Sequence, residues 1–122
     1  MSMNDQNDLS KRLFKFSIRV IKFLRILPKS AEYNVIQYQL VKCSTSAGAN
    51  YEESQGAISR ADFHNKVNIS LKEMRESNYW LRILEEVIDR KTKNIVELNS
   101  LIKESTELKN ILGTIVNKTK KT

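Results

Sequence analysis

The sequence contains few of the residues that interrupt or cross-link a chain. Its 122 residues include one proline, three glycines and one cysteine, Cys43. A β protein of this length needs turn residues roughly every ten positions, so the scarcity of proline and glycine favours long helices. A single cysteine excludes an intrachain disulfide and is typical of proteins from a reducing compartment.

Two further absences narrow the class of protein. No apolar run approaches the roughly 20 residues that cross a bilayer, and the polar, acidic start MSMNDQND does not match a secretory signal. We therefore expect a cytoplasmic protein. The length suits a single domain over residues 1–122, and a hydrophobic content of 40% is sufficient for a buried core.

Acidic residues are missing from one long N-terminal stretch. Residues 9–31 contain seven lysines and arginines without an aspartate or glutamate, and the chain as a whole has a formal net charge of +7. The rest of the chain is therefore neutral overall. Such an asymmetry indicates a polyanionic partner or a membrane surface.

Hydrophobic periodicity predicts an all-α protein. Apolar residues recur at spacings of three and four, and the third stretch keeps a heptad pattern for about seven turns. The predicted helices cover residues 8–27, 31–54, 60–90 and 94–115. Short connections make neighbouring helices antiparallel, which predicts an up-down-up-down four-helix bundle. We expect the lysine-rich tail, residues 117–122, to be disordered.

Residues that start and stop helices support these boundaries. Pro28 ends the first helix, because proline disfavours the helical conformation of the residue before it, and Gly56 is placed to stop the second. Ser30 is a candidate N-cap for the second helix. The pairs at the starts of the third and fourth helices resemble capping boxes: Ser59 with Asp62, and Asn94 with Glu97.

The segment CSTSAGANYEES, residues 43–54, has three interpretations. A phosphate-binding loop needs several glycines after a strand and usually a lysine, and this segment has neither. A helix whose small residues allow close packing is the better interpretation of this segment, because its backbone can approach the serines of the third helix. The predicted packing seam consists of Ala47, Gly48, Asn50, Ser70 and Ser77. Asn50 would lie inside, bond serines or a backbone carbonyl, and fix the register of the two helices.

The third interpretation is chemistry by Glu52 and Glu53. Adjacent helical residues lie about 100° apart and cannot face one substrate together. A di-metal bundle needs Glu-x-x-His motifs on two helices, whereas this chain has a single histidine, His64. We expect His64 to be an exposed polar residue and Cys43 a buried thiol. The sequence thus predicts no catalytic residue, no metal site and no cofactor.

A second apolar flank follows the heptad seam of the third helix. It carries tryptophan and tyrosine, which are frequent interface anchors, and it predicts self-association. The alternative is that Trp80 only widens the core. The predicted interface residues are Ile69, Tyr79, Trp80, Ile83 and Val87.

The basic face of the first helix has three interpretations. It can be a solvated surface, a phosphate-binding surface whose affinity falls with salt, or a membrane-surface helix. Membrane insertion is disfavoured because the apolar face of the same helix is needed for the core. No aromatic residue interleaves with the basic ones, so we expect no base-specific recognition. The candidate phosphate contacts are Lys11, Lys15, Arg19, Lys22 and Arg25.

Residues 44–87 resemble the bacterial four helix bundle protein family, also called the 23S rRNA intervening-sequence protein family. The strong match covers about a third of the chain, and the helix order and the break at Leu27-Pro28 extend it. The resemblance is carried by Ser46-x-x-x-Asn50, Tyr51-Glu52-Glu53, Arg60-Ala61-Asp62-Phe63, Lys72-Glu73, Glu76-Ser77 and Tyr79-Trp80-Leu81-Arg82.

This resemblance implies a four-helix bundle that assembles into a homopentameric ring. A related group, the accessory proteins of diversity-generating retroelements, is similar in fold and binds nucleic acid and a reverse transcriptase. The family supplies no catalytic residues to carry over. We therefore expect a non-enzymatic, nucleic-acid-binding oligomer (RNA or DNA), with a protein-interaction scaffold as the alternative.

Overall fold

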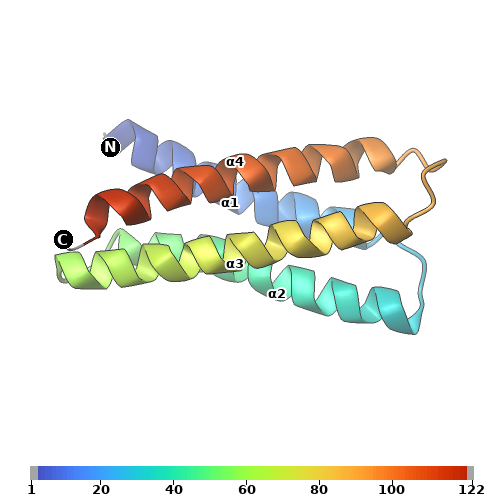
Figure 1. The fold of residues 1–122 in the computed structure, drawn as a ribbon, viewed down its shortest axis with the longest axis horizontal. Coiled ribbons are helices and arrows are strands. Elements are labelled where there is room, and N and C mark those ends of the chain that lie inside the picture. Colours follow the sequence, from blue (N-terminus) through green and yellow to red (C-terminus); the bar gives the residue numbers. More distant parts are fainter. Residues whose placement is uncertain (1–2, 121–122) are drawn as a thin grey trace.

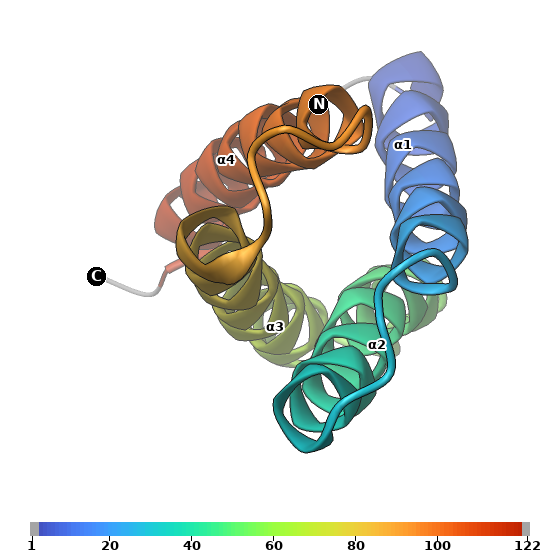
Figure 2. The same ribbon diagram turned by 90° about the vertical axis from the view of Figure 1, so that its right-hand side faces the viewer.

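Four antiparallel α-helices form a bundle in the computed structural model, which describes the backbone of residues 3–120 and the side chains of residues 8–120. The helices are α1 (Met3–Leu24), α2 (Ala31–Ser54), α3 (Arg60–Val87) and α4 (Ile95–Thr119). They run up, down, up and down along the long axis of the molecule (Figure 1). Seen from one end, they follow one another around a shared centre (Figure 2). The all-helical class predicted from the sequence is confirmed, and the described backbone contains no strand.

Two of the predicted N-caps are present. The hydroxyl of Ser30 accepts a hydrogen bond from the backbone N–H of Tyr33 at 3.1 Å. Ser59 caps α3 by accepting from the N–H of Asp62 at 3.0 Å, and the Asp62 carboxylate accepts in return from the N–H of Ile58 at 3.2 Å. These bonds satisfy amides that have no partner within the helix. The structure thus confirms where α2 and α3 begin.

Other boundaries differ from the prediction. Asn94 makes no side-chain cap bond at the start of α4, because its own backbone is helical (φ −76°, ψ −12°) and not extended as in a capping residue. The side chain of Glu97, its expected capping-box partner, pairs with Arg19 of α1. The third helix ends at Val87, three residues early. The fourth continues to Thr119, so the prediction of a disordered tail is wrong at residues 117–119; residues 121–122 lie outside the described part.

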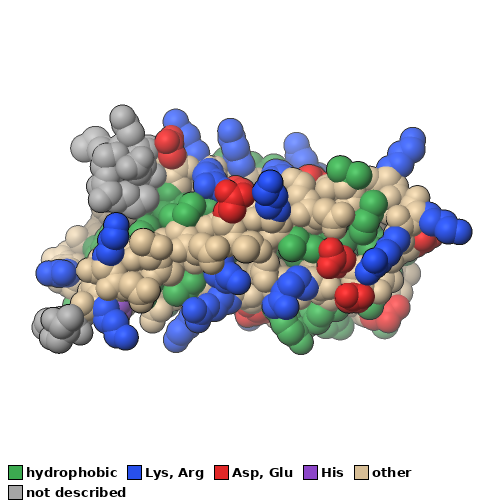
Figure 3. All heavy atoms as spheres, turned by 45° about the horizontal axis from the view of Figure 1, so that its top comes forward, with side chains coloured by type: hydrophobic (Ala, Val, Ile, Leu, Met, Phe, Trp, Pro, Cys, Tyr) green, Lys and Arg blue, Asp and Glu red, His purple; other side chains and the backbone are tan. Residues whose placement is uncertain are grey.

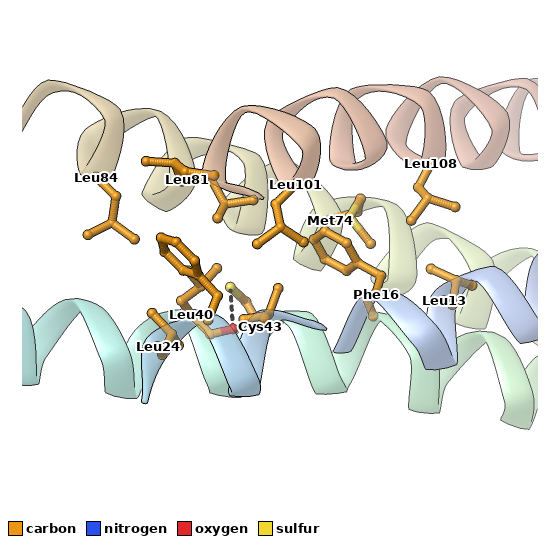
Figure 4. Packing of buried hydrophobic residues seen from close by; sticks show 14 of the residues in the cluster. Leu13, Phe16, Leu24, Leu40, Cys43, Met74, Leu81, Leu84, Leu101 and Leu108 are labelled. Carbon is orange, nitrogen blue, oxygen red and sulfur yellow. Dashed lines mark hydrogen bonds between the residues drawn. The ribbon is translucent and has the colours of Figure 1, made fainter. Parts of the chain in front are cut away.

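The core lies along the axis of the bundle, where leucines from all four helices meet Phe16, Cys43 and Met74 (Figure 4). The core stripe predicted along α1 by apolar spacings of three and four is at most 3% exposed and consists of Leu9, Leu13, Phe16, Val20 and Leu24. Tyr51 of α2 and Leu101 of α4 are also fully buried, at 0% exposed. The helices therefore bury a wider stripe than a strict heptad seam specifies.

The small-residue seam is present in part. Ser70 on α3 donates a hydrogen bond to the carbonyl of Ala47 on α2 at 2.7 Å, and the Ser77 hydroxyl lies 3.2 Å from the sulfur of Cys43. Gly48, however, faces Leu13 of α1 rather than α3. This change of neighbour follows from its position one residue after Ala47, about 100° further around the helix.

Asn50 does not fix the register of the two helices. Its amide nitrogen donates to the carbonyl of Ser46 at 2.9 Å and lies 3.1 Å from the Ser46 hydroxyl. Both groups belong to α2, and Asn50 is only half-buried. The expected partner types are correct, but the bonds stay within one helix. The serines of α3 make the ties between the helices.

Candidate nucleic-acid interface

The outward face of α1 presents a row of cations. Because the opposite face of α1 is buried in the core, these side chains point away from the bundle. The row comprises Lys11, Lys15 and Lys22 of α1 and Arg25, one residue beyond its end, and all four are exposed. Within residues 8–120 none of them makes an ion pair with a carboxylate. We call this set the α1 cation row.

Arg19 was also a predicted phosphate contact, but it faces α4. Its guanidinium donates to Glu97 at 2.8 and 3.3 Å and to the hydroxyl of Ser100 at 2.8 Å. Hydrogen bonding to Glu97 raises the pKa of Arg19. A guanidinium held by two carboxylate oxygens is already satisfied, so Arg19 joins α1 to α4 and does not belong to the cation row.

Arg12 makes a second tie of the same kind, which the sequence did not reveal. It donates to the two carboxylate oxygens of Glu104 at 2.7 and 3.1 Å, and Glu107 lies 3.6 Å away. The three glutamates of α4 are therefore all directed at α1 arginines. This pairing takes up the acids closest to α1, so the cation row is not neutralised from its α4 side.

Positive charge extends beyond α1. Lysine and arginine side chains project from much of the face shown in Figure 3, with carboxylates scattered between them. These cations contribute to the net charge of +7 and to the positive potential around the molecule.

Apolar side chains interleave with the cation row, contrary to the sequence prediction. Phe14 is 67% exposed and Ile18 is 36% exposed, and both lie among the lysines. They border a mostly apolar groove of about 330 Å³ between α1 and α2, whose α2 side is formed by Thr45, Gly48, Ala49 and Glu52. The periodicity could have revealed them, because Phe14 and Ile18 are large apolar residues outside the predicted core stripe.

The predicted self-association flank lies on the outer side of α3. Ile69, Tyr79 and Val87 are exposed, whereas Trp80 and Ile83 are half-buried and pack against the core. The indole N–H of Trp80 donates to Glu76 at 3.0 Å. The tryptophan thus widens the core, as the alternative interpretation held, and an apolar surface still remains outside it.

Three of the four residues considered for chemistry make contacts within the bundle, namely Cys43, His64 and Glu53. Burial raises the pKa of the Cys43 thiol to about 11, which leaves it almost entirely protonated and unreactive at neutral pH. His64 is half-buried, not exposed as predicted, and its Nδ1 lies 2.8 Å from the Thr119 hydroxyl. Glu52 and Glu53 are exposed, and Glu53 pairs with Lys66 at 3.2 Å.

The described residues contain no group of three or more histidine, cysteine, aspartate or glutamate side chains placed to hold a metal ion. No described helix is long and apolar enough to cross a membrane.

The geometry defines a class, a four-helix bundle whose first helix is basic on its outer side. Comparison with protein families gives a match over residues 5–114 to the family described as 23S rRNA-intervening sequence protein. The chain belongs to this family. The resemblance found in the sequence is thereby confirmed.

A solved structure supports the same assignment. It is the crystal structure of a protein of unknown function from the S23 ribosomal protein family of Bacteroides thetaiotaomicron VPI-5482. The two chains are 34% identical, with a TM-score of 0.76 over 88% of this chain and 97% of the other. Comparison with curated protein sequences gives no match.

Proposed function

We propose that this protein is a non-enzymatic, homo-oligomeric nucleic-acid-binding protein of the bacterial cytoplasm. Phosphates of an RNA or DNA backbone contact the α1 cation row. The observation that carries this proposal is that some of the basic residues of this segment are paired with carboxylates and the others are not. The acids of α4 pair with Arg12 and Arg19, whereas Lys11, Lys15, Lys22 and Arg25 have no such partner within residues 8–120.

The length of the cation row fits a nucleic-acid backbone. Lys11 and Lys22 are separated by roughly 17 Å along a helix that rises 1.5 Å per residue. One strand of B-DNA has a phosphate about every 3.4 Å of helix axis, so these lysines span about five phosphates. Lysines that replace condensed counterions gain entropy from counterion release. The resulting affinity is electrostatic and falls steeply with salt.

Membrane binding is less compatible with the contacts of α1. An amphipathic helix binds a membrane by inserting its apolar face. In this bundle that face packs in the core through residues such as Leu13, Phe16 and Val20, which are at most 1% exposed. Insertion would require α1 to leave the bundle and break its two arginine–glutamate ties.

Assembly into a homo-oligomer is the second part of the proposal. Near the C-terminal end of α3, Val87 is 53% exposed and lies beside the half-buried Ile83. An apolar patch of this kind is typical of a protein interface. A pentameric ring, which the family resemblance implies, would repeat the α1 cation row around an axis. A protein-interaction scaffold without a nucleic-acid ligand is the competing function.

Charge neutralisation on α1 tests the proposal. A variant with Lys11→Gln, Lys15→Gln and Lys22→Gln is expected to bind duplex DNA and structured RNA more weakly and to lose most of its salt dependence. The measurement is fluorescence anisotropy across a salt series, with helicity checked by circular dichroism.

The matched control has Lys72→Gln, Lys91→Gln and Lys93→Gln, which remove the same charge from exposed positions outside α1. The control should keep the wild-type salt slope. If the α1 variant binds as tightly as the wild type, the cation row is not the phosphate contact.

A further inference from the structure

A groove between α3 and α4 has the chemistry of a nucleic-acid site separate from α1. The two helices run side by side (Figure 1), and the groove between them has an open volume of about 670 Å³. This volume is within the range of small-ligand sites, about 300–1,000 Å³. Its lining contains no aspartate or glutamate and includes Arg75, Tyr79, Arg82, Lys109, Asn110 and Asn117.

A buried polar network fixes one of the cations in this groove. Asn78 is 4% exposed, and its amide nitrogen donates to Ser105 at 2.9 Å and to Thr106 at 3.1 Å across to α4. Its carbonyl oxygen accepts from Nε of Arg82 at 2.9 Å. The arginine is therefore held at one nitrogen, and its terminal nitrogens make no hydrogen bond within residues 8–120. A pre-positioned donor loses less entropy when it binds an anion.

An aromatic ring stands beside this arginine. Tyr79 is 51% exposed, and the edge-to-face contact with Trp80 holds it at a centroid distance of 5.5 Å. The guanidinium of Arg82 lies 6.0 Å from the centre of the tyrosine ring. Exposed aromatic rings next to cations are platforms on which unpaired bases stack. An inorganic anion has no flat face that could stack on such a ring, so the ring favours a ligand that carries a base.

Gly113 keeps the groove open. Glycine in the interior of α4 costs about 1 kcal/mol relative to alanine, and a Cβ added at Gly113 would meet no atom within 4 Å. Packing inside the protein therefore does not require this glycine. Its missing side chain leaves space between α4 and Arg75 where a ligand can lie against the backbone.

We propose that the α3–α4 groove binds single-stranded nucleic acid. One base stacks on Tyr79, and Arg75, Arg82 and Lys109 contact the flanking phosphates. The surface beyond Tyr79 includes Glu85 and Glu86, which repel phosphate and limit the site at that end. This inference rests on the proposed nucleic-acid function and adds a contact on the far side of α4 from α1.

The test compares a short fluorescein-labelled oligouridylate with a labelled hairpin duplex. Gly113→Leu fills the groove without altering any charge, and replaces glycine by a better helix former. It is expected to weaken single-strand binding about tenfold, the loss of one stacked base, while duplex binding is unchanged. Gly113→Ala, which adds only a methyl group, should bind like the wild type. The double variant Arg75→Gln, Arg82→Gln should lose single-strand affinity to a similar or greater degree.

The outcomes separate this site from the α1 cation row. If Gly113→Leu and the double arginine variant both bind oligouridylate like the wild type, the groove is not a binding site, whatever the α1 lysine variant does. If they lose affinity while the α1 variant binds both probes unchanged, the groove is supported and the α1 assignment is wrong. A wild-type protein that binds neither probe at low salt overturns both.

Discussion

At the scale of single residues, the α2 backbone at Gly48 faces Leu13 of α1 and has room for a methyl group. Gly48 stands among small residues, which predicts a close approach of two helices. A Cβ added there would lie 3.7 Å from the nearest atoms of Leu13, an ordinary van der Waals distance. The sequence shows that small residues lie together on this helix. Only the packing shows whether a neighbouring helix requires glycine there.

Gly48→Ala is therefore expected to stabilise the protein. Alanine is about 1 kcal/mol better than glycine in a helix interior, and the new methyl group fits against α1. For a domain of this size the melting temperature should rise by roughly 3–6 °C, measured by thermal denaturation. A lower melting temperature would show that α1 must move to accommodate the methyl group.

Glu73 makes stability depend on pH. Burial, and then the neighbouring Glu76, raise the pKa of Glu73 above its usual value. Folding therefore favours its protonated form, and wild-type stability gains as pH falls from neutral toward the usual glutamate pKa of about 4.3. Glu73→Gln should be more stable than the wild type at pH 7, and the difference should disappear near that pKa.

Urea denaturation of both proteins at neutral and acidic pH measures this effect. Glu52→Gln is the matched control, because Glu52 is exposed at the end of α2 and its replacement removes the same charge. A Glu73→Gln protein less stable than the wild type at pH 7 would contradict the assigned pKa shift.

At the scale of elements, hydrophobic periodicity predicted where the helices lie better than it predicted which side chains pair between them. The apolar spacing and the caps at Ser30 and Ser59 depend on local sequence, and the structure agrees with them. The pairing of Glu97 with Arg19 joins residues far apart in the chain, so no local pattern could show it. The side chain of Glu97 is engaged in this pairing and does not form the predicted capping box of α4. Because of the same pairing, Arg19 is not one of the outward-facing cations.

The proposed oligomer interface on the outer side of α3 can be tested by a single substitution. Val87→Glu places a charge on the exposed patch and is expected to dissociate the oligomer, because a charge in an apolar interface is costly to bury. Light scattering coupled to size exclusion gives the native mass.

Val96→Glu is the matched control for this experiment, since Val96 is 73% exposed on α4 and should tolerate the change. An unchanged native mass in Val87→Glu, with helicity retained, would rule out this face as the interface.

At the scale of the whole molecule, acidic side chains of α4 face α1, and the basic side chains of α1 that they do not pair with face outward. The α4 glutamates near α1 hold Arg12 and Arg19, and the remaining α1 cations face outward. The sequence could reveal the excess of positive charge in residues 9–31, but not which cations were already paired. The α3–α4 groove was also hidden, because its cations are separated along the chain and its open floor comes from the absence of a side chain at Gly113.

The salt dependence of nucleic-acid binding by the wild-type protein tests the central claim most directly. Four phosphate contacts from one protomer predict a slope of about −3.6 for duplex DNA when the logarithm of the association constant is plotted against that of the salt concentration. A steep slope of this size supports a cation row that tracks the backbone. Absence of binding at low salt, or a slope near zero, would contradict the account and favour a protein-interaction scaffold.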